Sequence, residues 1–314
     1  MRAFAVDAFG EQGSIREVPD PVPGEGEVLV RVTAAGLSAT DLAILAGWMQ
    51  GYYEHVFPLI PGIDAAGVVE AIGPGVTDFK AGDSVYGFVR RPVMGMGTFA
   101  ERVALPVTGI LHKPMSMRDE EAAVVPYSAL TAAAAVDAAA LRPGDSVVIL
   151  GATGGVGSYA TQMAAAAGAR VIAITRGDYG DYARLMGAED VIDYTTSDPV
   201  EALRQRAPKG VDAEIDLVGM PDLTNGVSSI VHAGGHVVSV VMPPDVEALA
   251  ARGVEGIMTT RIVMEHRLGE ICGQIVGGAI KLPAIQEFRF DQISDALALQ
   301  ATRHVRGKLV AVMH

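Results

Sequence analysis

Short runs of alternating hydrophobic and polar residues, separated by Gly and Pro, fill the first third of the chain. Glu27–Val32 alternates between the two kinds, Ala65–Ile72 is more continuously apolar, and Asp83–Gly87 is another short run. Runs of this length between turn residues are typical of β-strands. The pattern therefore predicts an all-β region, forming a small irregular barrel.

The pattern changes near Ser116, where a hydroxyl residue precedes acidic ones, as at a helix N-terminus. Beyond this point, helix-length segments alternate with apolar runs, which are Ser146–Leu150, Arg170–Thr175, Asp190–Ile192, Ala213–Val218 and His236–Val241. This alternation indicates a parallel sheet covered by helices on both faces. After Pro243 we expect a long helical stretch, then Glu287–Phe290, a last helix and a closing strand at Lys308–Val312.

Composition narrows the classes of function. With 314 residues, half of them apolar, the chain is long enough for two domains. A net charge of −13 disfavours nucleic acid and anionic membranes as partners. The single cysteine, Cys272, excludes a disulfide within the chain and a thiolate cluster for structural zinc. The apolar stretch Ala129–Ala140 is too short to span a bilayer, and nothing resembles a signal peptide, so we expect a cytoplasmic protein.

A glycine-rich segment, Gly151–Gly157, joins the apolar run Ser146–Leu150 to a helix-length segment, Ser158–Ala167. Glycines let a backbone approach a pyrophosphate, and a following helix N-terminus offers N–H groups to it. The spacing is one residue longer than G-x-G-x-x-G. We therefore predict a dinucleotide site at Gly151, Thr153, Gly154, Gly155, Val156 and Gly157. A turn that serves only packing is the alternative.

The next apolar run ends in Thr175-Arg176-Gly177. A site for NAD usually carries an acidic residue here, which binds the ribose 2′-hydroxyl. A guanidinium can instead pair with a 2′-phosphate. We therefore predict that Thr175 and Arg176 bind the cofactor and that the cofactor is NADPH. A surface arginine is the alternative, and the nearby Asp178 favours it.

Four segments together resemble the medium-chain dehydrogenase/reductase superfamily, and within it the zinc-free quinone oxidoreductases. These are Pro61–Gly87, Leu141–Ile172, Leu185–Tyr194 and Gly307–Val310. The resemblance implies an α/β fold with a GroES-like β-barrel catalytic domain, residues 1–115 and 250–314. It also implies a Rossmann domain with a doubly wound parallel sheet, residues 116–249.

The resemblance also implies further cofactor contacts. They would come from Thr131, from Tyr194 beside the 2′-phosphate, and from Val218, Val240 and Val241 at strand ends. Val263 and Met264 would lie on the nicotinamide side. A homodimer formed through an edge strand of the Rossmann sheet is implied too, and the run His236–Val241 is compatible with that role.

Zinc-dependent members of this superfamily hold their metal with a Cys, a His-Glu pair and a second Cys. The resembling positions here are Ser38, Ile63-Asp64 and Tyr127. Ile63 cannot bind a metal, and neither Ser nor Tyr is a usual zinc ligand. His232 and His236 are separated by two glycines and are not expected to share a helix face. We therefore expect no metal.

Without zinc, the easiest reaction is hydride transfer from NADPH to a quinone or an α,β-unsaturated carbonyl (an enone), because the anion formed needs only hydrogen bonds and a proton. The predicted catalytic residues are Ser38 and Thr40, which offer hydroxyls, and Asp41, which could orient them. The alternative for Asp41 is a carboxylate that stabilises the N-terminus of a helix over Leu42–Ala46.

Trp48, Met49 and Tyr52, with Tyr53 beside them, are predicted to form an apolar lid over a planar substrate. A buried aromatic cluster is the alternative. Two other functions remain open: a zinc-free alcohol or ketone oxidoreductase with a proton relay through Thr40, and a cofactor-binding protein with little catalysis.

Overall fold

The computed structural model describes residues 1–89, 91–259 and 265–313 and divides into two compact units. The first unit contains Met1–Tyr127, Glu265–Gly277 and Leu282–His314, and the second contains Ser128–Met264 and Gly278–Lys281. The chain thus leaves the first unit and returns to it, as the resemblance implies. The sequence analysis placed the domain boundaries at residues 115 and 250, whereas the two units divide after Tyr127 and after Met264.

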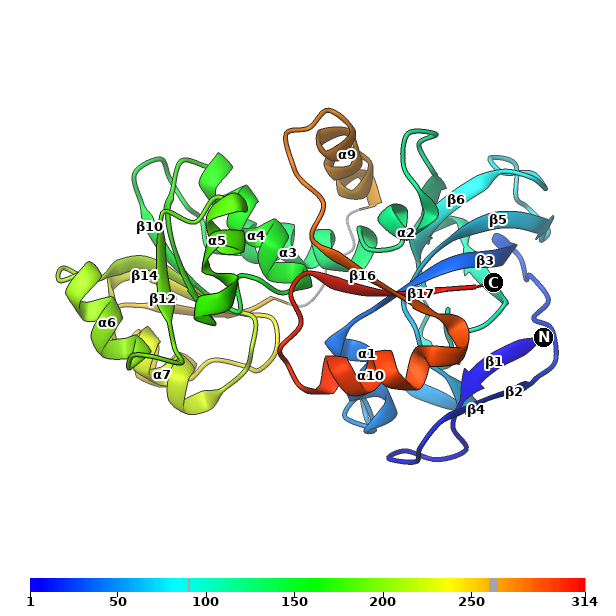
Figure 1. Cartoon of the computed structure of the whole chain (residues 1–314), viewed down its shortest axis with the longest axis horizontal. Helices are drawn as coiled ribbons and strands as arrows, with labels where there is room; N and C mark the ends of the chain where they lie inside the picture. The colour runs from blue at the N-terminus through cyan, green and yellow to red at the C-terminus, as the bar shows by residue number, and fades with distance from the viewer. Residues whose placement is uncertain (90, 260–264, 314) are drawn as a thin grey trace. The chain divides into compact units, whose positions relative to one another are not determined.

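A seven-stranded sheet forms the centre of the first unit, in the order β16-β17-β3-β5-β6-β9, with β8 also paired to β3 (Figure 1). Its long strand β3 pairs with β8 over its first half and with β17 over its last residues. The closing strand β17 therefore joins the N-terminal strands in one sheet. The strands are β3 (Glu27–Leu37), β5 (Asp64–Ile72), β6 (Ser84–Phe88), β8 (Arg102–Pro106), β9 (Ile110–His112), β16 (Ile285–Arg289) and β17 (Lys308–Val312).

Smaller elements complete the first unit. Strands β1 and β2 form an antiparallel two-stranded sheet, and strands β4 and β7 form a parallel one. Their strands are β1 (Arg2–Ala5), β2 (Ser14–Glu17), β4 (Glu54–Ile60) and β7 (Val93–Met96). The helices are α1 (Ala39–Leu45), η1 (Val107–Gly109), α2 (Asp119–Ala122), α9 (Glu265–Val276), η3 (Phe290–Gln292) and α10 (Ile293–Ala301). Inward-facing residues of β3, β5 and β17 form the core together with Phe99 and Phe290.

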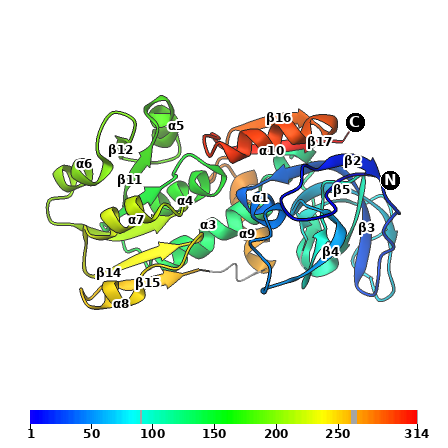
Figure 2. The same ribbon diagram turned by 90° about the horizontal axis from the view of Figure 1, so that it is seen from below.

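A six-stranded sheet forms the second unit, in the order β12-β11-β10-β13-β14-β15, and every pairing in it is parallel. Figure 2 labels β11, β12, β14 and β15 of this sheet. The strands are β10 (Ser146–Leu150), β11 (Arg170–Thr175), β12 (Asp190–Asp193), β13 (Val211–Asp216), β14 (Val231–Ser239) and β15 (Glu255–Met258). This strand order, with the first strand in sequence at the centre, is that of the Rossmann fold.

Helices connect these strands. They are α3 (Pro126–Ala138), α4 (Gly155–Ala166), η2 (Gly177–Tyr179), α5 (Gly180–Leu185), α6 (Pro199–Arg206), α7 (Pro221–Ser228) and α8 (Val246–Ala250). Helix α3 begins in the first unit and continues in the second. The central strand β10 is buried from Val147 to Leu150, which is why it is apolar without alternation. The predicted α/β fold, a GroES-like barrel domain with a Rossmann domain, is confirmed.

Several predicted elements differ from those observed. A strand, β15, occupies part of the region after Pro243 that was expected to be helical, and it joins the Rossmann sheet. The prediction missed it because four residues cannot show a period of their own. Helix α2 begins at Asp119 rather than at Ser116.

The predicted edge strand is also wrong. The run His236–Val241 falls in and after β14, which pairs with β13 on one side and with β15 on the other. An interior strand has no unpaired backbone groups to offer to a second copy of the chain. Among the described residues, β12 and β15 are the two outer strands of this sheet.

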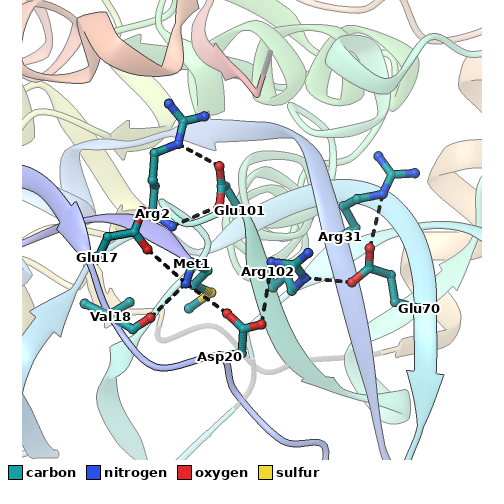
Figure 3. Close-up of polar contacts among 9 residues, drawn as sticks. All are labelled: Met1, Arg2, Glu17, Val18, Asp20, Arg31, Glu70, Glu101 and Arg102. Atoms are coloured by element: carbon teal, nitrogen blue, oxygen red, sulfur yellow. Dashed lines mark hydrogen bonds and ion pairs between the residues drawn. The ribbon is translucent and has the colours of Figure 1, made fainter.

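Ion pairs on the surface of the first unit hold its N-terminal strand (Figure 3). The backbone N–H and Nε of Arg2 both donate to Glu101, at 2.9 and 2.7 Å. Glu70 accepts from Arg102 at 2.8 Å and pairs with Arg31 at 3.4 Å. Pairs this exposed each contribute little to stability.

Candidate functional site

The glycine loop of the second unit is tightly packed at Gly157 and leaves free space at Gly154. Gly151 has a φ of +78°, which favours glycine. A Cβ on Gly157 would lie 2.1 Å from the carbonyl oxygen of Gly151, so only glycine lets the first turn of α4 pack against the loop. A Cβ on Gly154 would have nothing nearer than 3.5 Å. The loop therefore leaves room above Gly154, at the start of a 12-residue helix, where a pyrophosphate would fit.

Thr153 and Thr175, both predicted cofactor residues, bond to each other. Their hydroxyls lie 2.8 Å apart, and both side chains are buried. This bond joins the glycine loop to the end of β11. The two side chains thus fix the shape of the loop, while Gly155 and Val156 begin α4 and direct its backbone N–H groups.

Arg176 lies just beyond β11, among two tyrosines. Its Nε donates to Asp178 at 3.1 Å, and its guanidinium carbon lies 5.7 Å from the centre of the Tyr179 ring. The hydrogen bond to Asp178 is the main reason that the pKa of Arg176 is raised. Burial raises the pKa of Tyr194, and the charge of Arg176 opposes that shift. The bond to Asp178 does not use the terminal nitrogens of Arg176, the pair that a phosphate takes.

Sequence reasoning missed Tyr179, which lies three residues after the predicted Arg176. It also missed why residue 177 is a glycine: a Cβ there would lie only 2.2 Å from Oδ2 of Asp193. Asp193 in turn accepts from the backbone and the hydroxyl of Thr195, and these bonds lower its pKa. The turn that presents Arg176 and Tyr194 is therefore closely packed.

A buried carboxylate, Asp216, organises the two loops at the ends of β13 and β14. Its Oδ1 accepts from the backbone N–H groups of Val218 and Gly219, at 2.9 and 3.0 Å. Its Oδ2 accepts from the hydroxyls of Thr224 at 3.0 Å and Ser239 at 3.5 Å. These bonds hold the predicted residue Val218 in place.

The second loop is bonded through Ser239. Its hydroxyl oxygen accepts from the backbone N–H groups of Val241 and Met242, both at 3.2 Å, and Val240 bonds back to the carbonyl of Asp216. Sequence reasoning named Val218, Val240 and Val241 and missed the two polar residues that hold them. An acidic residue, Asp216, inside the apolar run Ala213–Val218 and close to Gly219 was the available signal.

Of the remaining predicted cofactor residues, the structure describes only Thr131. Thr131 lies in α3, one helical turn after Tyr127. Val263 and Met264 lie outside the described residues, so the structure places neither of them.

In the first unit, Asp41 lies in the first turn of α1 with its carboxylate completely buried. Oδ2 accepts from the backbone N–H and the hydroxyl of Ser38, at 2.7 and 3.0 Å, and Oδ1 accepts from the backbone N–H of Gly62 at 3.2 Å. Burial raises the pKa of Asp41 to about 6. Asp41 thus orients Ser38, as expected, and also stabilises the start of the helix, which was the alternative.

Thr40 forms a different contact. Its hydroxyl lies 2.7 Å from the hydroxyl of Tyr127, the second residue of α3, and either group can be the donor. Both side chains are partly buried. Asp41 was expected to orient Thr40 as well, but the observed partner of Thr40 is Tyr127. Sequence reasoning considered Tyr127 only as a position where a metal ligand is missing.

Asp64 and Lys308 form a buried ion pair that is bonded to the backbone of Tyr127. Nζ of Lys308 lies 3.5 Å from Oδ2 of Asp64, and both side chains are almost inaccessible to solvent. Oδ1 of Asp64 accepts from the backbone N–H of Tyr127 at 2.9 Å. The carboxylate is therefore engaged by two partners from distant parts of the sequence.

The donor set here does not fit a catalytic zinc. Ile63 is apolar and buried, Ser38 donates to Asp41, and Tyr127 bonds to Thr40. Across the part of the chain that the structure describes, no three His, Cys, Asp or Glu side chains gather as a metal site requires. His232 and His236 pair with different acids, Asp212 at 2.9 Å and Glu255 at 3.6 Å.

The predicted aromatic lid lies on the surface. Trp48 is 68% exposed and Tyr52 is 82% exposed, while Met49 is partly buried. The alternative, a buried cluster, is wrong for Trp48 and Tyr52. The aromatic cluster of this region instead centres on Phe9, whose ring meets those of His55 and Phe57 edge to face at 5.0 and 5.1 Å.

Comparison with known proteins agrees with this architecture. Residues 24–115 match the model of the alcohol dehydrogenase GroES-like domain, and residues 155–271 match that of the zinc-binding dehydrogenase family. A solved structure of an alcohol dehydrogenase superfamily protein from Novosphingobium aromaticivorans is 30% identical, with a TM-score of 0.85, and each chain covers the whole of the other. The chain belongs to this superfamily, the medium-chain dehydrogenases/reductases. The second family model is named for zinc binding, but Ser38, Ile63 and Tyr127 of this chain are not usual zinc ligands.

Relatives within the superfamily carry several names. The quinone-oxidoreductase QR1 of Triphysaria versicolor is 28% identical over 99% of this chain and 98% of its own. The human NAD(P)H oxidoreductase RTN4IP1 is 29% identical over 99% of this chain and 88% of its own. The synaptic vesicle membrane protein VAT-1 homolog of Rattus norvegicus is 34% identical over 72% of this chain, but this match spans only 56% of that protein.

The chain is therefore an oxidoreductase of a nicotinamide-dependent family, with quinone oxidoreductases among its relatives. Among the described residues, no helix combines the length and the apolar character needed to cross a membrane.

Proposed function

We propose that this protein transfers a hydride from NADPH to a quinone or an α,β-unsaturated carbonyl without using a metal. The observation that carries the proposal is the set of hydroxyls at the positions where zinc-dependent relatives hold their metal. Ser38 and Tyr127 are hydrogen-bonded side chains there, and Ile63 removes a third ligand. Hydroxyls can stabilise the anion of a reduced quinone or enone, whereas activation of a simple alcohol needs more.

The choice of NADPH rests on Arg176. Its guanidinium, with Tyr179 and Tyr194 beside it, offers a cationic and aromatic setting at the end of β11. A 2′-phosphate would compete with Asp178 for this arginine, and two negative charges outweigh one. The human relative is named for use of NAD(P)H, which supports a nicotinamide cofactor of either kind.

Each part of the site has its own task. The loop from Gly151 to Gly157 would hold the pyrophosphate, and Thr131, Val218, Val240 and Val241 would flank the rest of the cofactor. The bound nicotinamide supplies the hydride. Thr40 and Tyr127, whose hydroxyls are paired, would together offer a hydrogen bond to the substrate oxygen. The Ser38 hydroxyl donates to Asp41, which keeps it in place with its oxygen as an acceptor. Trp48, Met49 and Tyr52 would cover the planar face of the acceptor.

A zinc-free ketone reductase is the second candidate, because the bond between Thr40 and Tyr127 forms the start of a proton relay. We further propose a homodimer in the cytoplasm that binds neither membranes nor nucleic acid. The outer strand β15 replaces His236–Val241 as the edge available for a second copy.

Oxidation of NADPH, followed at 340 nm with a quinone, an enone and a ketone, tests the proposed function. We expect turnover with the quinone and the enone, a slower reaction with the ketone, and no loss of activity after treatment with a chelator. Fastest turnover of the ketone would favour the second candidate. Binding of NADPH without turnover of any acceptor would instead leave a cofactor-binding protein with little catalysis.

A further inference from the structure

The hydroxyl of Tyr127 is held by Thr40 at 2.7 Å, at a point where the end of β3, the start of β5 and the start of α3 meet. We propose that Tyr127 is a catalytic residue, which donates a hydrogen bond and then its phenolic proton to the oxygen of the reduced substrate. In this proposal Thr40 is the positioning residue that holds the phenol and replaces its proton. The proposal rests on the proposed function and assigns its proton donor.

Tyr127 is fixed at both of its ends. Its backbone N–H donates to the buried Asp64, which the ammonium of Lys308 pairs with from β17. Its hydroxyl is fixed by Thr40 in the first turn of α1. The same turn is bonded to the segment before β5, because Asp41 accepts from the backbone of Gly62. A donor held this firmly requires little reorganisation when charge develops on the substrate, which is the condition for strong electrostatic stabilisation.

The chemistry of the two hydroxyls assigns their roles. Either hydroxyl can be the donor in the bond between them. When Thr40 donates, the phenolic proton of Tyr127 is the one that can pass to an oxygen atom of the substrate. A phenol has an ordinary pKa of about 10. This value is much nearer to the pKa of an enol than the pKa of an aliphatic hydroxyl is. Proton transfer from Tyr127 is therefore easier than transfer from Thr40. The bond from Thr40 then stabilises the phenolate that is left.

The position of Tyr127 on α3 suits this role. Tyr127 and Thr131 lie four residues apart on one continuous helix and so share a face. Four residues correspond to a rise of about 6 Å. Under the proposed function Thr131 flanks the cofactor, so the proposed proton donor would lie one helical turn from a residue that contacts it.

The step balances as follows for an enone. A hydride adds to the β-carbon, the C=C electron pair moves to form the enolate, and the coenzyme is oxidised as the substrate is reduced. The O–H bond of Tyr127 breaks as a new O–H bond forms on the substrate oxygen, and the resulting enol converts to the ketone. The phenolate regains its proton from solvent through Thr40, which takes one proton from water as it gives its own to Tyr127, and the hydroxide that is left is neutralised by the solvent. For a quinone, the same proton neutralises the hydroquinone anion.

The variant Tyr127→Phe tests the proposal in the full-length protein, with an enone and a quinone as separate acceptors. We expect kcat with the enone to fall about 10²-fold, as when a single oxyanion donor is removed. The loss with the quinone should be smaller, because a hydroquinone anion is less basic than an enolate and depends less on its donor. The dissociation constant of NADPH should not change.

Two further sets of variants serve as controls. Tyr86→Phe removes the same phenolic oxygen from a buried tyrosine in β6 and should have no effect on kcat. Thr40→Val, which is isosteric, should lower kcat with the enone, and Thr40→Ser should recover most of that loss by restoring a hydroxyl.

The outcomes distinguish a failure of the Tyr127 assignment from a failure of the proposed function. Equal losses with both acceptors, or a weaker affinity for NADPH, would indicate a structural role and overturn the proposal. So would an unchanged kcat in Tyr127→Phe with an active wild type. If the wild type itself turned over neither acceptor, the proposed function would fail first.

Discussion

Nζ of Lys308, in the closing strand β17, lies 3.5 Å from Oδ2 of Asp64, at the start of β5. The other oxygen of Asp64 accepts from the backbone of Tyr127, where α3 begins. One buried carboxylate thus joins three segments that are far apart in the sequence. Because it lies beside the hydroxyl pair of Thr40 and Tyr127, its contribution to stability and its contribution to the site can be measured separately.

Removal of one partner of this ion pair should be costly. Lys308→Met leaves the Asp64 carboxylate buried without its countercharge, and we expect the free energy of unfolding to fall by about 3 kcal/mol. The double variant Lys308→Met/Asp64→Asn should recover most of this loss, because it removes both charges and keeps an oxygen that accepts from Tyr127. Denaturant titrations followed by circular dichroism would measure both changes. Losses that simply add in the double variant would show that the two side chains are not coupled.

Arg176→Ala should separate the two nicotinamide cofactors. Loss of a charged hydrogen bond to the 2′-phosphate should weaken NADPH binding about 10- to 100-fold, since such bonds contribute about 1.5–3 kcal/mol. NADH has no such phosphate, and its affinity should stay the same. Fluorescence titration with each cofactor gives both constants. Arg184→Ala, which removes an exposed arginine of α5 paired with Asp181, is the matched control. Equal losses for the two cofactors would contradict the assignment of Arg176.

Asp216→Asn should disturb only one half of the cofactor site. An amide nitrogen cannot accept from Thr224 and Ser239, so the loops after β13 and β14 should loosen. We expect NADPH to bind about 10-fold more weakly, because the lost bonds contribute about 1 kcal/mol each. Adenosine 2′,5′-bisphosphate, which lacks the nicotinamide half, should bind as before in calorimetry.

Asp222→Asn, in the exposed first turn of α7, is the control for this variant and should bind both ligands normally. If Asp216→Asn lost affinity for the bisphosphate as well, the carboxylate would be supporting the whole domain and not only these two loops.

Glu214 should make the stability of the second unit depend on pH. Burial in β13 raises the pKa of Glu214 to about 8, against the bond from Ser228, which lowers it. The unfolded chain binds this proton only below its ordinary pKa of 4.5. The associated stability is therefore complete below pH 4.5 and is lost as the pH rises to about 8.

Glu214→Gln removes this titration and keeps an uncharged side chain of the same shape. The melting temperatures of the two proteins, measured by scanning calorimetry between pH 5 and pH 9, should diverge as the pH rises, with the variant more stable at the alkaline end. Curves that stay parallel over this range would show that Glu214 does not ionise as proposed.

The sequence determined most of the second unit, because its signals are local. The strands Ser146–Leu150 and Arg170–Thr175 were predicted to the residue, since strands buried on both faces are apolar runs bounded by turns. The glycine loop was predicted for the same reason: its conformation depends on residues within one turn. Arg176, and the residues Ser38, Ile63 and Tyr127 at the resembling metal positions, could be named from residue type alone, and the roles inferred from them stay predictions.

Only the tertiary structure decided which distant side chains meet. The bond between Thr40 and Tyr127 joins residues 87 positions apart, and neither type signals a partner. The same holds for the ion pair of Asp64 with Lys308 and for the two loops gathered by Asp216. The short strand β15, and with it the true edge of the sheet, depends on pairing with β14 and not on its own four residues. A sequence records propensities along the chain, whereas hydrogen bonds between buried groups depend on distances that only the complete fold sets.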